Sequence, residues 1–196
     1  LNDANEKVAH PLSNVKRKFR TILRLNDSLA LLGGDDGLSI LRDTTSELIH
    51  PKLNIKKLIT LNNKVYCAAF DGLYEFEMDG EFQQFQRIKL PVENINTITG
   101  DAWGNLWIGT INGLYIMNKE KDFYRFPLDE REYRAKTILG LIQTKKKDMW
   151  ISTMNGVYMV SFEESLENDY RVYNYGISEG LVNMECNVNA LYEDDM

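Results

Sequence analysis

The stretch Leu106–Met117 reads LWIGTINGLYIM, which is two short strand-like runs joined by an Asn-Gly pair. Three further stretches share this plan of an apolar run, a glycine turn and a second apolar run. They are Leu29–Leu41 (LALLGGDDGLSIL), Val65–Phe76 (VYCAAFDGLYEF) and Met149–Val160 (MWISTMNGVYMV). Asx-Gly pairs favour tight hairpins because both residues tolerate positive φ. The chain therefore contains an internal repeat, and each unit includes two adjacent strands.

The spacing of the repeat predicts an architecture. The turn glycines, Gly37, Gly72, Gly113 and Gly156, are 35, 41 and 43 residues apart. A period near forty with adjacent strands in each unit is typical of β-propeller blades, which are four-stranded antiparallel sheets arranged around an axis.

The prolines support the same period. The chain has four, Pro11, Pro51, Pro91 and Pro127, and they are 40, 40 and 36 residues apart. Proline has no N–H to donate within a sheet, so it belongs at strand ends or in connections. The prolines are therefore expected to lie in the connections from one blade to the next.

We expect an all-β chain with four complete blades, at residues 19–50, 55–88, 95–126 and 137–175. β-Branched and aromatic residues fill the strand-like runs, and sustained 3.6-residue periodicity is lacking. Residues 187–196 are predicted to be a partial fifth blade, with Asn187–Tyr192 as its innermost strand. Because the N-terminal Leu1–His10 is too polar to complete that blade, we expect an open arc of a larger propeller, such as one with seven blades.

The bulk composition narrows the class of protein. The 196 residues are 43% apolar and 27% charged, which is enough for a core and unlike a disordered chain. The net charge is −6 and the basic residues are scattered, so nucleic-acid binding is not expected. The sequence has neither a membrane-spanning run nor a signal peptide. Because it begins with Leu1, we take it as a piece of a longer protein, and that absence says nothing about location.

No motif in the sequence indicates catalysis, a metal or a cofactor. His10 and His50 each precede a proline, and neither has a serine or cysteine partner in a nucleophile motif. HExxH, P-loop and GxGxxG patterns are absent. The two cysteines, Cys67 and Cys186, are too few for a zinc site and are interpreted as small buried side chains, with a disulfide between them left open. We predict no catalytic residue, no metal and no cofactor.

The sequence around Leu106–Met117 resembles a known repeat. Residues 101–110, DAWGNLWIGT, followed by NGLY at 112–115, resemble the two-component regulator propeller repeat. Lys147–Thr153 (KDMWIST) is similar to a second copy, whereas the first two units lack the tryptophan. Tyr173–Tyr192 is similar to the segment that leads into a late blade of such proteins. The resemblance extends over most of the chain from about Phe19.

The resemblance implies a sensor. Such propellers form the periplasmic part of regulators that span the inner membrane, notably hybrid histidine kinases, and many respond to oligosaccharides. Seven-bladed propellers commonly precede a β-sandwich, a membrane span and cytoplasmic signalling domains. It therefore implies a non-catalytic periplasmic input segment of a parent histidine kinase. Its implied partners are the rest of the propeller, the β-sandwich, an oligosaccharide and a second copy of the chain.

Three residues are candidates for ligand contact. Asp35 and Asp36 are the one acidic pair in a glycine turn, suited to a sugar hydroxyl or a cation. Trp103 lies in a turn without an evident demand from the core, so we expect it to be exposed. Asp101 is interpreted instead as a cap for the backbone N–H groups of its turn.

Other aromatic residues are interpreted as structural. Trp107 and Trp150 occupy equivalent strand positions and are expected to fill space between blades rather than stack on a sugar. Tyr170, Tyr173 and Tyr175 alternate along one strand and share a face, which we expect to pack on the next blade.

Two other functions stay open. One is a structural or dimerising propeller without a ligand. The other is a propeller hydrolase or lyase, whose paired carboxylates no pattern in the sequence singles out.

Overall fold

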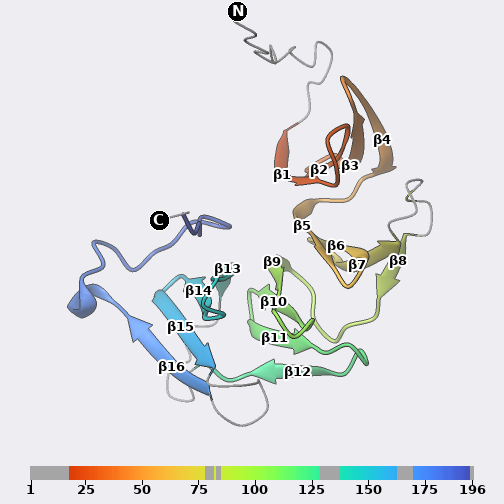
Figure 1. The fold of residues 1–196 in the computed structure, drawn as a ribbon. Coiled ribbons are helices and arrows are strands. Elements are labelled where there is room, and N and C mark those ends of the chain that lie inside the picture. Colours follow the sequence, from red (N-terminus) through yellow and green to blue (C-terminus); the bar gives the residue numbers. More distant parts are fainter. Residues whose placement is uncertain (1–17, 78–81, 83–84, 129–136, 163–169, 195–196) are drawn as a thin grey trace, which may run out of the picture.

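The computed structural model describes residues 18–77, 82, 85–128, 137–162 and 170–194. Within these ranges the chain forms four-stranded antiparallel sheets that follow one another along an open arc (Figure 1). Helix in this part of the chain is limited to the 3-10 turn η1 (Ile177–Glu179). The all-β fold class and the four-stranded blades are thus confirmed.

Each sheet contains four strands in chain order. Sheet 1 has β1 (Phe19–Arg24), β2 (Leu29–Gly34), β3 (Gly37–Arg42) and β4 (Thr45–Pro51). Sheet 2 has β5 (Ile55–Leu61), β6 (Lys64–Ala69), β7 (Gly72–Glu77) and β8 (Gln86–Ile88). Sheet 3 has β9 (Ile95–Gly100), β10 (Leu106–Thr110), β11 (Gly113–Met117) and β12 (Phe123–Phe126). Sheet 4 has β13 (Ile138–Gln143), β14 (Met149–Thr153), β15 (Gly156–Phe162) and β16 (Tyr170–Tyr175).

The four repeat glycines begin the third strand of each sheet. Their φ values lie between 96° and 150°, a region that glycine adopts without steric cost. Gly113, for example, pairs with Thr110, whose Oγ1 accepts a hydrogen bond from the N–H of Asn112. The glycine repeat therefore marks the tight second-to-third strand hairpin, as predicted.

The prolines mark the connections between sheets. Pro51 is the last residue of β4, Pro91 lies between β8 and β9, and Pro127 lies between β12 and β13. At these positions the proline does not have to donate a backbone N–H to a neighbouring strand. Pro11 falls outside the described residues.

The hydrophobic core lies between the sheets. It consists of three clusters, one for each pair of successive sheets. Their members include Leu31 and Leu58 between sheets 1 and 2, Tyr66 and Ile98 between sheets 2 and 3, and Trp107 and Tyr158 between sheets 3 and 4. Each sheet is therefore stabilised through its neighbours, as in other repeat proteins.

One repeat position shows how the arc ends at sheet 1. Leu58, Ile98 and Leu141 occupy the same register position in the first strands of sheets 2, 3 and 4, and all three are buried against the preceding sheet. Ile22 occupies this position in sheet 1 and is 69% exposed. Among the described residues, sheet 1 has no preceding sheet to cover it.

The other end of the arc, at sheet 4, has the matching feature. Trp107 is fully buried on the face of sheet 3 that meets sheet 4. Trp150, at the same position in sheet 4, is half-buried and stacks on Tyr175 at a centroid distance of 5.4 Å. The prediction that both tryptophans fill space between blades is therefore confirmed for Trp107 only. Tyr170 does not share the face of Tyr173 and Tyr175, because residues three apart on a strand point to opposite faces, and its ring packs on Phe126 of sheet 3 at 4.9 Å. Tyr173 lies on the face of Trp150 and is 41% exposed, so the packing of that face on a next blade stays a prediction.

Two strand predictions need correction. The aromatic run Phe82–Ile88 indicates an outer strand for the second blade, but among its described residues the strand covers Gln86–Ile88. Phe82 has φ 54° and its ring packs edge-on against that of Phe76. Asn187–Tyr192 is not a strand, since it forms no ladder with any strand among the described residues and Asn189 has φ 56°. The segment nevertheless lies against sheet 4, where the N–H of Asn189 donates to the carbonyl of Leu139.

The close approach of successive sheets predicts the effect of adding one methyl group. A Cβ at Gly109 would lie 2.5 Å from Cγ2 of Ile138 and 2.7 Å from Cγ2 of Thr97. Gly109→Ala is therefore expected to lower the free energy of unfolding by about 1–3 kcal/mol through overpacking. Urea denaturation followed by circular dichroism measures the change.

Ser152 is the matched control at the equivalent position of sheet 4. Its hydroxyl is buried without a hydrogen-bond partner, so Ser152→Ala should change stability by less than about 1 kcal/mol. Equal stability of Gly109→Ala and the wild type would contradict the proposed role of sheet-to-sheet contact.

Candidate functional site

The sheets present two sets of turns on opposite faces of the arc. Antiparallel order places the first-to-second strand turns at one end of every sheet, at residues 25–28, 62–63, 101–105 and 144–148. We call this the first-turn face. The second-to-third strand turns, at residues 35–36, 70–71, 111–112 and 154–155, lie at the other end together with the starts of the innermost strands. We call this the second-turn face.

The three predicted ligand-contact residues do not come together. Asp35 and Asp36 are exposed in the turn of sheet 1 on the second-turn face, and Asp35 forms an ion pair of 2.6 Å with Arg20. Trp103 belongs to sheet 3 and lies on the first-turn face. They therefore do not form one site, and ligand contact by each of them stays a prediction.

Trp103 is half-buried rather than exposed. Its ring meets the ring of Phe162 from sheet 4 edge-on at 5.1 Å, and Nζ of Lys147 lies 5.9 Å from its centroid. Edge-to-face and cation–π contacts of this kind fix the orientation of an indole. Packing between sheets thus takes part of the surface that a sugar would need.

Asp101 holds its turn together, as interpreted from the sequence. Its carboxylate accepts hydrogen bonds from the backbone N–H groups of Trp103 (3.0 Å) and Asn105 (2.8 Å). It also accepts from Nδ2 of Asn105 and from Nε1 of the buried Trp107, both at 2.9 Å. Only 7% of Asp101 is exposed, so its oxygens serve the fold and not a ligand.

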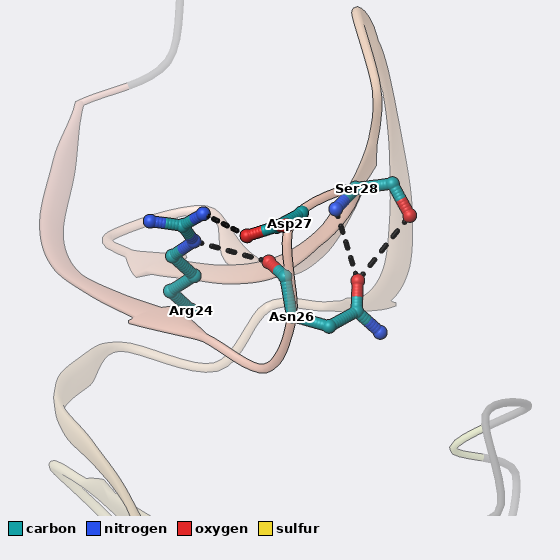
Figure 2. Close-up of polar contacts among 4 residues, drawn as sticks. All are labelled: Arg24, Asn26, Asp27 and Ser28. Carbon is teal, nitrogen blue, oxygen red and sulfur yellow. Dashed lines mark hydrogen bonds and ion pairs between the residues drawn. The ribbon is translucent and has the colours of Figure 1, made fainter.

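The equivalent turn of sheet 1 uses different residues for the same purpose. Oδ1 of Asn26 accepts from the backbone N–H (3.0 Å) and the hydroxyl (3.2 Å) of Ser28, an Asx turn shown in Figure 2. The guanidinium of Arg24 donates to the carbonyl of Asn26 and forms an ion pair with Asp27. The guanidinium of Arg24, on the first-turn face, is therefore already paired with Asp27.

The carboxylate of Asp71 is also engaged, on the second-turn face. It accepts a hydrogen bond of 2.6 Å from the hydroxyl of Tyr74. Burial, together with this bond, raises the pKa of Tyr74 to about 12. Asp71 thus orders its own hairpin.

The innermost strands carry an irregularity at one repeated position. An extra residue interrupts the register at Arg20 in β1, Lys56 in β5, Asn96 in β9 and Leu139 in β13. Such bulges re-aim a side chain and are frequent next to binding sites. Here they place these four residues near the second-turn face, beside the turns.

Polar side chains at these bulges link successive sheets. Nζ of Lys56 lies 3.4 Å from Oδ1 of Asn96, and Nδ2 of Asn96 donates to the carbonyl of Ile138 at 3.0 Å. Asn96 is buried, so its amide is held in one orientation. The result is a polar bridge from sheet 2 through sheet 3 to sheet 4.

Asn189 completes this bridge from the C-terminal segment. Its Nδ2 lies 3.3 Å from the carbonyl of Lys56 and 3.4 Å from that of Asn96, while its N–H donates to Leu139. The sequence reasoning did not single out Asn189. A signal was present, since Val188–Leu191 (VNAL) repeats the apolar-Asn-small-apolar pattern of Ile95–Ile98 (INTI).

Exposed apolar side chains lie on the same face of the arc as these polar groups. Phe70, Ile111 and Met154 occupy the same position two residues before the turn glycine, and they are 56%, 41% and 51% exposed. Nζ of Lys56 lies 5.9 Å from the centroid of Phe70. Sequence reasoning missed this set because it considered the glycines and not the residue two positions earlier. We call Lys56, Asn96 and Asn189, with these three apolar residues, the central site.

Reactive groups are not gathered at this site. Within the described ranges, His, Cys, Asp and Glu do not form a group of three or more that could hold a metal ion. Both cysteines are free, so the disulfide left open from the sequence is not formed. Burial raises the pKa of the Cys67 thiol, and the ring of His50 stacks on Phe85 at 4.2 Å.

The comparison with protein families agrees with the sequence. Residues 89–112 match the Two component regulator propeller family. This segment includes β9, β10 and the Asp101 turn, so the resemblance inferred from the motif is confirmed there. No curated protein matches the chain.

Solved structures with the same fold include extracellular domains of regulatory systems and a lyase. The extracellular domain of a hybrid two-component system from Bacteroides thetaiotaomicron is 16% identical, with TM-score 0.58, 86% of this chain and 30% of that chain covered. The extracellular domain of a one-component system from the same organism is 14% identical, with a TM-score of 0.56. That match covers 86% of this chain and 29% of that chain. A catalytically inactive virginiamycin B lyase from Staphylococcus aureus with quinupristin is 9% identical, with a TM-score of 0.60. That match covers 82% of this chain and 58% of that chain.

These likenesses establish the propeller fold. The chain spans about a third of the length of the two extracellular domains. Among the described residues, no helix combines the length and the apolar character needed to cross a bilayer.

The Asp101 turn predicts a strong effect on stability. Asp101→Ala leaves the indole N–H of Trp107 and two backbone N–H groups without their acceptor. Because buried donors without partners are costly, the free energy of unfolding should fall by about 3 kcal/mol, measured by urea denaturation.

Asp148 in the corresponding turn of sheet 4 is the control. Within the described part of the chain its backbone carbonyl accepts a hydrogen bond but its carboxylate does not, so Asp148→Ala should change stability by about 0.5 kcal/mol or less. If both substitutions had the same small effect, the Asp101 turn would not stabilise sheet 3.

Proposed function

We propose that this chain is part of a periplasmic sensor propeller in a membrane-spanning two-component regulator and that its central site binds an oligosaccharide. The match of residues 89–112 to the regulator propeller family supports the sensor. The exposed apolar set around a polar centre is the observation that supports binding on the second-turn face. In this proposal the segment does no chemistry, and a histidine kinase elsewhere in the parent protein provides the output.

The central site has the chemistry that a sugar requires. Phe70 offers an exposed aromatic face for the C–H side of a pyranose, and Ile111 and Met154 extend the apolar surface. Asn189 has a buried Oδ1 without a hydrogen-bond partner, as does Asn54 at the start of sheet 2. A sugar hydroxyl that donates to either oxygen would satisfy a group whose burial is otherwise unfavourable.

The same residues offer a way to transmit binding. Asn189 contacts the carbonyls of Lys56, Asn96 and Leu139, which belong to three different sheets. A ligand that competes for the Asn189 amide would change how firmly the C-terminal segment is held against the sheets. Differential binding to two such arrangements shifts their populations, which is the thermodynamic basis of signalling.

The open ends of the arc support the proposed protein partners. Ile22 at one end and Trp150 at the other occupy positions that are buried wherever a neighbouring sheet is present. In the proposal, further blades of the same propeller cover both faces, and a β-sandwich follows in the parent chain. A second copy of the chain is the alternative partner.

The two other functions remain alternatives. A structural or dimerising propeller is favoured by the same open ends, which would meet another copy. A hydrolase or lyase has only the likeness to the virginiamycin B lyase, which at 9% identity concerns the fold alone.

The sensor proposal predicts a ligand-dependent rise in thermal stability. A panel of plant and host oligosaccharides at about 1–5 mM, near the weak end of measurable affinities, should include one that raises Tm. Phe70→Ala should abolish the shift without unfolding the chain, because Phe70 is already largely exposed. Differential scanning fluorimetry measures the shift.

Tyr173→Ala is the matched control, since Tyr173 is an exposed aromatic on the outer strand of sheet 4, away from the central site. It should keep the shift. A panel without any shift would count against ligand sensing by this segment and leave the structural alternative, whereas product formation would favour the enzyme.

A further inference from the structure

A cavity lies on the first-turn face, on the opposite side of the sheets from the central site. It has a volume of about 270 Å³ and lies between sheets 2 and 3. It is lined by apolar residues, amides and three lysines: Leu61, Asn62, Lys64, Tyr66, Gly104, Leu106, Met117, Asn118, Lys119 and Lys121. Drug-sized ligands occupy about 300–1,000 Å³, so this cavity suits a single small ring.

The lysines at this cavity are only partly neutralised. Nζ of Lys121 lies 2.5 Å and Nζ of Lys64 3.5 Å from oxygens of Glu75, which is only 7% exposed. Lys64 also pairs with Glu77 at 3.0 Å. Lys119 has no ion-pair partner among the described residues. Three lysines therefore line the cavity, and the ammonium of Lys119 is the one that is available for an anion.

The walls of the cavity are fixed without a ligand. Nδ2 of Asn62 in sheet 2 donates to the carbonyl of Gly104 in sheet 3 at 2.9 Å, which joins the two turns. The side chain of Asn118 exchanges hydrogen bonds with Asp122 at 2.8 and 3.0 Å. A Cβ at Gly104 would lie 2.4 Å from Cε of Lys119, so the stem of this lysine lies against the glycine. Such preorganisation lowers the entropic cost of binding.

The neighbouring cavity between sheets 1 and 2 differs in its charges. It has about 350 Å³ and is lined by Arg24, Leu25, Thr60, Leu61, Asn62 and Asn63. Its one cation, Arg24, is paired with Asp27 (Figure 2). The available positive charge on an apolar floor is therefore a property of the cavity between sheets 2 and 3.

We propose that the cavity between sheets 2 and 3 binds a small carboxylate with an apolar ring. The carboxylate lies at the rim and pairs with Lys119, since Lys64 and Lys121 are occupied by Glu75, and the ring lies on Leu61, Leu106 and Met117. The lysines exclude a metal cation, and the apolar floor distinguishes such a ligand from a fully hydrated inorganic anion. This site does not depend on the proposed function of the central site.

An NMR titration of the whole chain with sodium benzoate tests the proposal. The ¹H–¹⁵N shifts should change at residues 61–66, 104–106 and 117–121, with a Kd of about 1 mM. Benzyl alcohol, which has the ring without the charge, and inorganic phosphate, which has charge without the ring, should each bind at least about tenfold more weakly.

Lys119→Gln should weaken benzoate binding about tenfold, whereas Lys146→Gln, in the first-to-second strand turn of sheet 4 and outside the lining of the cavity, should leave it unchanged. Lys119 is chosen because its loss leaves no buried charge unpaired, while loss of Lys121 would leave Glu75 without its nearest cation. The dispersion of each spectrum shows whether the variant is folded.

The proposal is overturned by benzoate and benzyl alcohol binding equally, by shifts confined to the second-turn face, by equal binding of benzoate to Lys119→Gln, or by the absence of any shift. Equal binding of phosphate and benzoate would likewise contradict the role of the apolar floor.

Discussion

Apolar side chains cover both faces of the sheets in this chain, so each sheet is stabilised by packing against the sheets beside it. The three core clusters lie between successive sheets, and none lies within a sheet. The innermost strands approach so closely that Gly109 meets Ile138 of the next sheet. The uncovered faces at Ile22 and Trp150 are consequences of the same constraint, since a face made for packing has no neighbour there.

This constraint also determines where function can lie. Strand side chains are committed to packing, which leaves the turns and the bulged starts of the innermost strands for recognition. The two faces use these places differently. The second-turn face combines exposed apolar residues with the Lys56–Asn96–Asn189 bridge, whereas the first-turn face has a cavity with an unpaired lysine, Lys119. Two chemically different ligands are thus conceivable on one arc of sheets.

The fold could be predicted from the sequence because the repeat is marked by residues with strict backbone requirements. Gly37, Gly72, Gly113 and Gly156 need positive φ, and the prolines avoid the ladders, so their spacing predicts the hairpins and connections. The candidate site was harder to predict. Asp35, Asp36 and Trp103 were chosen from single turns, but register places them on opposite faces, and the contacts of Asn189 join segments more than ninety residues apart. Such juxtaposition depends on how sheets stack, which no local pattern encodes.

Residue-resolved hydrogen exchange tests the central claim, that each sheet is stabilised by its neighbours, most directly. Sheets 2 and 3 have neighbours on both sides, so the amides of β6 (Lys64–Ala69) and β10 (Leu106–Thr110) should exchange most slowly. The amides of β2 (Leu29–Gly34) and β14 (Met149–Thr153), in the end sheets, should exchange faster by at least about tenfold, because the end sheets can open without disrupting the centre. Equal protection in all four sheets, or greater protection in sheet 1 or sheet 4, would contradict the account.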